Sequence, residues 1–142
     1  MSELARLELV DLLNLVDESI KSDVDYSQEF FYFLRKNRDK IKSMVQTIVE
    51  TNDQALKSYR DKLRLEKAIA PEHGANPFRL LDENKFNEIA VEYRKTLDES
   101  VAFMREKVEV EFYVWSKNAP ENLPHKILDV LLTHGLIVET HQ

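Results

Sequence analysis

Residues 82–108, DENKFNEIAVEYRKTLDESVAFMREKV, carry the clearest periodic pattern in the chain. Apolar side chains recur there at intervals of three or four residues, as they do on one face of an α-helix. They are Phe86, Ala90, Tyr93, Leu97, Val101, Met104 and Val108. Several of these lie eleven residues apart, a spacing that keeps a helix nearly straight, and Asp82 stands where an N-cap belongs. The stretch predicts one long helix that Asp82 caps.

A second apolar stripe lies upstream of this helix. Its members are Phe30, Leu34, Ile41, Val45 and Ile48, and the apolar face continues with Ala55, Leu56, Tyr59 and Leu63. The pattern weakens at 51–54, so the helix either breaks there or runs on to about Ile69. Residues 70–77, APEHGANP, form the best predicted loop because they hold two prolines and a glycine. The two helices on either side of it should form a long antiparallel hairpin.

The ends of the chain predict a small sheet and a short helix. Apolar and polar residues alternate over 108–115 and over Arg6–Val10, which predicts two short strands that pair. Asp11 should then cap the first helix. A last short helix carries Ile127, Leu128, Leu131 and Leu132, and Gly135 stands where a left-handed C-terminal cap belongs. The expected fold class is mainly α with a minor β element, in a single domain over 1–142.

Composition excludes several classes of protein. The 142 residues include only two glycines and four prolines, too few turn residues for an all-β sandwich or barrel. The absence of cysteine excludes a disulfide framework, a thiolate metal site and a cysteine nucleophile. No window is apolar enough to span a membrane, and the N-terminus lacks a signal-peptide core. We therefore expect a cytoplasmic protein with no membrane partner.

Charge is unevenly distributed along the chain. The net charge of −6 divides into −6 over residues 1–29, +5 over residues 30–69 and −5 over residues 70–142. Blocks of opposite sign pair within the fold, pair between subunits or mark a binding face. We expect self-association, most simply as a symmetric homodimer.

Motifs for catalysis are weak in this sequence. Two glycines cannot form a glycine-rich phosphate loop, and the histidines His73, His125, His134 and His141 lack the spacing of a metal-binding helix motif. Glu72 beside His73 offers an acid–base pair in principle, but a polar turn explains it better, because nothing else in the loop supports a mechanism. The sequence therefore predicts a protein that is not an enzyme and carries no metal or cofactor.

Two segments hold candidate partner-binding residues. The basic run at 35–42, RKNRDKIK, follows the aromatic run at 30–33, FFYF, on the same predicted helix. Such a run suits a solvated helix face, a protein-binding face or a nucleic-acid site, and the last is disfavoured because the chain is acidic. The polar face of 108–115 ends in tyrosine and tryptophan, which are frequent at binding hot spots unless a helix covers the tryptophan. The candidates are Phe31, Tyr32, Arg35, Lys36, Arg38, Tyr113 and Trp115.

Asn37 interrupts the apolar stripe of the first long helix. A polar residue in such a stripe is expected on a buried or interfacial face, where it can fix register or partner choice at some cost in stability.

The order of these elements resembles a family of small, uncharacterised bacteriophage-encoded helical proteins. The resemblance rests on the segments Leu12–Asn14, Lys36–Asn37, Tyr59–Ala70, Asp82–Phe86, Val108–Glu111 and Leu123–Pro124. The low glycine content and the short loop before Phe78 depart from the family pattern. The resemblance implies a viral accessory protein that acts in the cytoplasm of a bacterial host, and it supplies no catalytic residues.

Together these observations predict a non-enzymatic accessory or modulator protein, of the inhibitor or regulator type, that binds a host or viral protein complex. One alternative is a homo-oligomeric structural or assembly factor. Another is a nucleic-acid-binding accessory protein that uses residues 35–42. The identity of the protein partner does not follow from the sequence.

Overall fold

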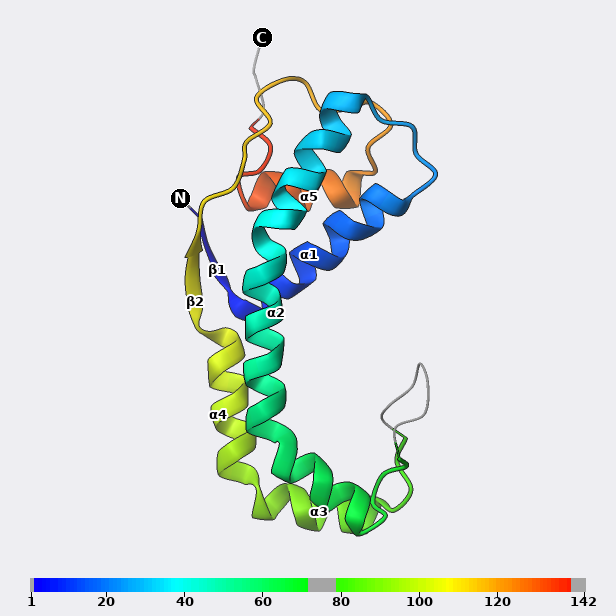
Figure 1. Ribbon diagram of the computed structural model, residues 1–142, viewed down its shortest axis with the longest axis vertical. Helices are drawn as coiled ribbons and strands as arrows, with labels where there is room; N and C mark the ends of the chain where they lie inside the picture. The colour runs from blue at the N-terminus through cyan, green and yellow to red at the C-terminus, as the bar shows by residue number, and fades with distance from the viewer. Residues whose placement is uncertain (1, 72–78, 139–142) are drawn as a thin grey trace. The chain divides into compact units, whose positions relative to one another are not determined.

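The computed structural model describes residues 2–71 and 79–138, and its fold is mainly α with a minor β element (Figure 1). The elements are β1 (Ser2–Ala5), α1 (Arg6–Lys21), α2 (Gln28–Leu65), α3 (Glu83–Glu92), α4 (Arg94–Arg105), β2 (Lys107–Val110) and α5 (His125–Thr133). The chain divides into two compact units. Unit 1 holds the residues up to Ile48 and from Arg105 onward, and unit 2 holds Val49–Met104.

Helix α1 begins earlier than the sequence predicts. The expected strand at Arg6–Val10 and the expected cap at Asp11 are both wrong, because Arg6 already opens the helix. A strand would place Leu7 and Leu9 on the same face, whereas Leu9 is fully buried and Leu7 is 49% exposed. The helical spacing of Leu9, Leu12 and Val16, all buried, therefore prevails over a five-residue alternation.

The two-stranded sheet confirms that an N-terminal strand pairs with the strand that follows α4. Its register is antiparallel, with Ser2 opposite Val110 and Ala5 opposite Lys107. The predicted strand at 108–115 is too long, since β2 ends at Val110 and the ladder stops where β1 begins. Further along, Trp115 forms an isolated parallel bridge with Ile137.

The core of unit 1 lies between the first half of α2, α1 and the C-terminal segment. Phe30, Leu34 and Ile41 of α2 are fully buried. Helix α5 follows Pro124 and buries Leu131, and Gly135 takes the predicted left-handed conformation with φ of 78°. That turn sends Leu136 and Ile137 back into the core, where they are at most 2% exposed. The predicted short C-terminal helix and its glycine cap are both confirmed.

Unit 2 is a helical hairpin made by the second half of α2 with α3 and α4 (Figure 1). Its antiparallel sense follows from two hydrogen bonds: Lys62 Nζ donates to Glu92, and Ser100 Oγ donates to Asn52 Oδ1 at 2.6 Å. The core cluster consists of Tyr59, Leu63, Ala68, Ile69 and Ile89, with Phe86, Tyr93 and Leu97 packed against it. Residues 51–54 do not break the helix, and Asn52 serves instead as a contact between helices.

The prediction of one straight helix after Asp82 is wrong in its length. Asp82 does cap α3, through a bond from the Lys85 N–H to its side chain, but the helix ends at Glu92 and α4 begins at Arg94. Tyr93 between them turns away from helical geometry, with φ of −99° and ψ of 18°. The buried face also shifts, since Ile89, outside the predicted stripe, is 2% exposed, whereas Val101 within it is 48% exposed.

Two further predictions concern the loop at 70–77 and membrane spans. The acid–base pair at His73 and most of the loop at 70–77 lie outside the described residues. Within the described ranges, no helix is both long enough and apolar enough to cross a membrane.

Candidate functional site

The aromatic run at the start of α2 points in several directions, because four consecutive side chains of a helix face different ways. Phe30 and Phe33 are buried, whereas Tyr32 is 64% exposed. Phe31 is half-buried beside Tyr26, with the ring centroids 5.4 Å apart. One turn of helix thus contributes to the core on one side and leaves a tyrosine open to solvent on the other.

Asn37 lies one turn after Phe33 and is fully buried, as predicted. Its Nδ2 donates to the carbonyl oxygens of Phe33, at 3.2 Å, and Tyr113, at 3.0 Å. Its Oδ1 accepts from the Tyr113 N–H at 2.9 Å. The carboxamide therefore takes the place of a neighbouring strand and fixes the segment after β2 against α2.

Trp115 is held two residues further on. Its ring lies 5.1 Å from Phe30 and 5.5 Å from Phe33, between centroids, and α2 therefore covers one side of it. The Trp115 N–H donates to the carbonyl of Leu136 at 2.7 Å, and the indole Nε1 donates to the carbonyl of Asn118. Trp115 remains half-buried. It is therefore neither fully covered by a helix nor fully open to a partner, the two alternatives that the sequence left.

These contacts create a groove of about 370 Å³ on unit 1, which we call the aromatic–lysine groove. It is lined by Glu29, Tyr32, Phe33, Lys36, Tyr113, Val114, Trp115 and Lys117. Lys36 Nζ lies 4.1 Å from the centre of the Tyr113 ring and 5.1 Å from that of Tyr32. Such cation–π contacts stabilise by about 0.5–1 kcal/mol at exposed sites, so they hold the lysine over the groove.

Two more lysines surround the same groove. Lys40 Nζ lies 5.0 Å from the centre of the Tyr113 ring, and Lys117 Nζ lies 5.8 Å from that of Trp115. Glu29 compensates part of this charge, because its Oε2 accepts from Lys117 Nζ at 2.6 Å. Three lysines thus face one carboxylate around exposed aromatic surface, which favours an anionic, partly apolar ligand.

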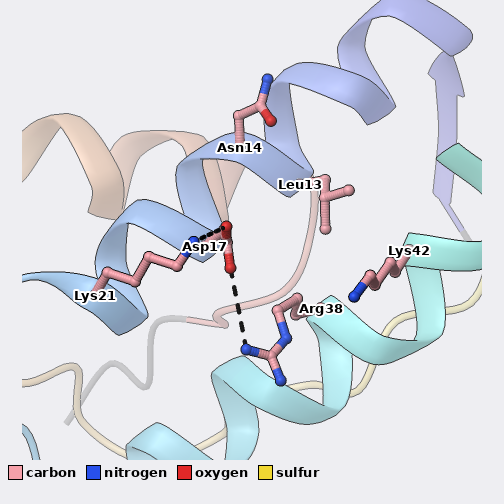
Figure 2. Close-up of a pocket in the computed structure, with 6 residues that line it drawn as sticks. All are labelled: Leu13, Asn14, Asp17, Lys21, Arg38 and Lys42. Carbon is pink, nitrogen blue, oxygen red and sulfur yellow. Dashed lines mark hydrogen bonds and ion pairs between the residues drawn. The ribbon is translucent and has the colours of Figure 1, made fainter. Parts of the chain in front are cut away.

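The basic run does not form one face. Arg35 lies over Phe31, with 5.5 Å between its guanidinium carbon and the ring centre. Arg38 and Lys42 line a different pocket with Asp17 and Lys21 of α1 (Figure 2). There Arg38 approaches Asp17 at 4.0 Å and Asp39 at 3.1 Å.

Asp17 is the acidic centre of this second pocket. Lys21 donates to it at 2.9 Å, and Figure 2 shows both contacts of its carboxylate. The hydrogen bond from Lys21, followed by the charges of Lys21, Arg38 and Lys42, lowers the pKa of Asp17. Since the cations already have an internal counter-ion, this pocket is a weaker candidate than the aromatic–lysine groove.

The structure brings together four of the seven predicted partner-binding residues: Tyr32, Lys36, Tyr113 and Trp115. Phe31 and Arg35 pair with each other outside the lining, and Arg38 belongs to the second pocket. The sequence prediction did not include the other four lining residues, Glu29, Phe33, Val114 and Lys117. Two of these carried a signal: Phe33 belongs to the aromatic run and Val114 to the alternating segment, whose apolar side is expected to be buried. Phe33 is indeed buried, whereas Val114 is 53% exposed.

Among the residues that the structure describes, no group of three or more histidine and acidic side chains is placed to hold a metal ion. No family model, curated protein or solved structure matches the chain.

Proposed function

We propose that this protein binds another protein through the aromatic–lysine groove and thereby modulates the complex to which that partner belongs. The proposal rests on a contact between two segments that are distant in the sequence, α2 and the residues after β2. Asn37 fixes Tyr113 beside Lys36 and Tyr32, so tyrosine surface and lysine charge from α2 and from the segment after β2 share one groove.

The chemistry of the groove defines the partner. Tyr32 and Tyr113 are 64% and 43% exposed, and rigid aromatic surface of this kind commonly anchors protein interfaces. Lys36, Lys40 and Lys117 favour a segment rich in aspartate or glutamate. The proposed partner therefore presents an acidic segment with apolar side chains among its acidic ones.

The setting of the proposal comes from the resemblance to small bacteriophage-encoded proteins. It supports a host or viral protein complex in a bacterial cytoplasm as the target. Nucleic acid is a poorer candidate, because Lys36 lines one pocket and Arg38 and Lys42 line another, so the cations of residues 35–42 do not form one continuous face.

Affinity capture from a bacterial lysate, with mass spectrometry, tests the proposal. We expect wild type to retain a specific acidic partner and the variant K36E/K117E to lose it, because reversed charges repel the acidic segment. The matched control is K57E, which changes an exposed lysine of unit 2. A partner retained equally by all three proteins would exclude the groove as its binding site.

A homo-oligomeric assembly factor is the second candidate function. It is favoured by exposed apolar side chains in unit 2, where Leu65 and Val91 are 83% and 72% exposed. Sedimentation equilibrium distinguishes the two functions. A homodimer should dissociate when Leu65 and Val91 are replaced by serine, whereas a modulator with a different partner should be monomeric before and after the change.

A further inference from the structure

In the described part of the chain, the segment 112–115 after β2 has one edge whose peptide groups are hydrogen-bonded and one whose peptide groups are not. The N–H and C=O of Tyr113 both bond to Asn37, and those of Trp115 both bond to residues of the 136–138 segment. In an extended chain, both polar groups of one residue point to the same edge, and alternate residues point to opposite edges. Phe112 and Val114 therefore direct their peptide groups to the other edge.

This other edge is the same edge that pairs with β1. The Arg6 N–H donates to the carbonyl of Glu106, so Glu106 and every second residue after it, Val108 and Val110, direct their peptide groups toward β1. The same alternation continues to Phe112 and Val114, beyond Ser2, where β1 begins. Within residues 2–71 and 79–138, the peptide groups of Phe112 and Val114 have no hydrogen-bond partner.

We propose that the acidic segment of the partner adds as a β-strand along the edge at Phe112 and Val114. It would lie on the same edge of the chain that pairs with β1. This inference rests on the proposed function and specifies its binding mode. Strand addition draws affinity from backbone hydrogen bonds and specificity from alternate side chains. Val114 is 53% exposed and Phe112 is 8% exposed, so the Val114 end of this edge is the part that lies at the surface.

The charges around the edge set the register of the added strand. Its side chains that share a face with Tyr113 and Trp115 meet Lys36, Lys40 and Lys117. Glu109 lies in β2 and Glu111 directly follows it, so both carboxylates repel acidic side chains at the β2 end of the edge. The acidic residues of the partner are therefore placed opposite the Tyr113–Lys117 end.

The probe is a short peptide selected on the wild-type protein from a yeast-displayed library of random sequences and then synthesised. V114P tests the edge, because proline removes the Val114 N–H, which has no partner among the described residues, and suits an extended residue before it. V114T changes the same side chain but keeps the N–H, and K57E is the control outside the groove. We expect V114P to weaken binding about five- to tenfold, the effect of one hydrogen bond, V114T to weaken it less than V114P, and K57E to bind as wild type.

Amide hydrogen exchange of the wild-type complex tests the same point without a variant. The Val114 N–H should exchange more slowly in the complex, whereas the Tyr113 N–H, already bonded to Asn37, should change little. This measurement decides the matter even if V114P fails to fold.

The outcomes separate the two proposals. One outcome is that acidic peptides bind wild type and V114P equally, do not bind K36E/K117E and leave the exchange of the Val114 N–H unchanged. That outcome overturns strand addition but supports the groove as the binding site. Neutral peptides that protect Val114 keep strand addition and overturn the acidic partner. A library that yields no binder overturns both, and a dimer that protects Val114 without peptide assigns the edge to a second copy of this chain.

Discussion

The carboxamide of Asn37 forms a pair of hydrogen bonds with the backbone of Tyr113, at 3.0 Å to its carbonyl oxygen and 2.9 Å from its N–H. The two residues are 76 positions apart in the sequence. The pair explains why a fully buried polar side chain is tolerated in an apolar helix stripe, because its polar atoms are satisfied. It also gives Asn37 a structural role that affects the groove through the position of Tyr113.

Replacing Asn37 by leucine should therefore destabilise the protein. The change leaves the N–H and C=O of Tyr113 without their partner, at a cost of about 1–3 kcal/mol for each buried group that stays unsatisfied. Urea denaturation measures the loss, with Asn14→Leu on the exposed face of α1 as the control. A gain in stability with partner binding unchanged would show that Asn37 contributes only a cost.

The hairpin of unit 2 should respond to truncation according to burial. Leu63→Ala should lower the free energy of unfolding by about 2–5 kcal/mol, because Leu63 is fully buried. Leu97 is only half-buried at the edge of the cluster, so Leu97→Ala should cost about 1–2 kcal/mol. Val101→Ala, at a position 48% exposed, is the control and should cost less than about 0.5 kcal/mol. Equal losses at all three positions would contradict this packing.

Stability should fall at alkaline pH partly through Tyr59. Burial raises the pKa of Tyr59 above its ordinary value of 10.0. A raised pKa gives stability that is fully present below pH 10.0 and is lost as pH rises through the folded-state value.

Tyr59→Phe should therefore flatten the loss of stability above pH 10.0 and change stability little at neutral pH. Thermal denaturation across this pH range measures the effect. Tyr32→Phe, at a position 64% exposed, is the matched control. An alkaline transition that is the same in both variants would assign it to other groups.

The two pockets should separate the roles of Lys36 and Arg38. Lys36→Glu should weaken binding of an acidic partner about tenfold, as expected for reversing one charge beside the binding groove. Arg38→Glu should leave binding unchanged and lower stability by about 1 kcal/mol, because the new carboxylate faces Asp17 and Asp39. Binding titrations and thermal denaturation of both variants measure these effects. Equal losses of binding would mean that residues 35–42 act as one basic face.

Charge blocks along the chain already pair within each unit. In unit 1, Asp17 of the acidic first block pairs with Arg38 of the basic middle block. In unit 2, Lys62 of the basic middle block pairs with Glu92 of the acidic last block. The alternative of pairing within the fold therefore has direct contacts in its favour, whereas the homodimer stays a prediction.

Local patterns predicted the helices well and their ends less well. Spacing of three and four residues is repeated many times in α2, so its buried face could be read directly. The alternation at Arg6–Val10 covers too few residues to separate a strand from a helix, and the break at Tyr93 leaves the apolar spacing unchanged. Half of the residues that line the groove could also be predicted, in part because aromatic and basic residues follow one another on α2.

The sequence by itself determined the helical class, the apolar face of α2, the C-terminal glycine turn and the burial of Asn37, because each depends on neighbours within one element. Only the tertiary structure decided which lysines meet which aromatic rings. Lys36 and Tyr113 come together because Asn37 binds a backbone that no local pattern identifies as its partner. The division of the basic run between two pockets has the same origin, since the directions of its side chains follow from helix geometry, but what they face depends on segments distant in the sequence.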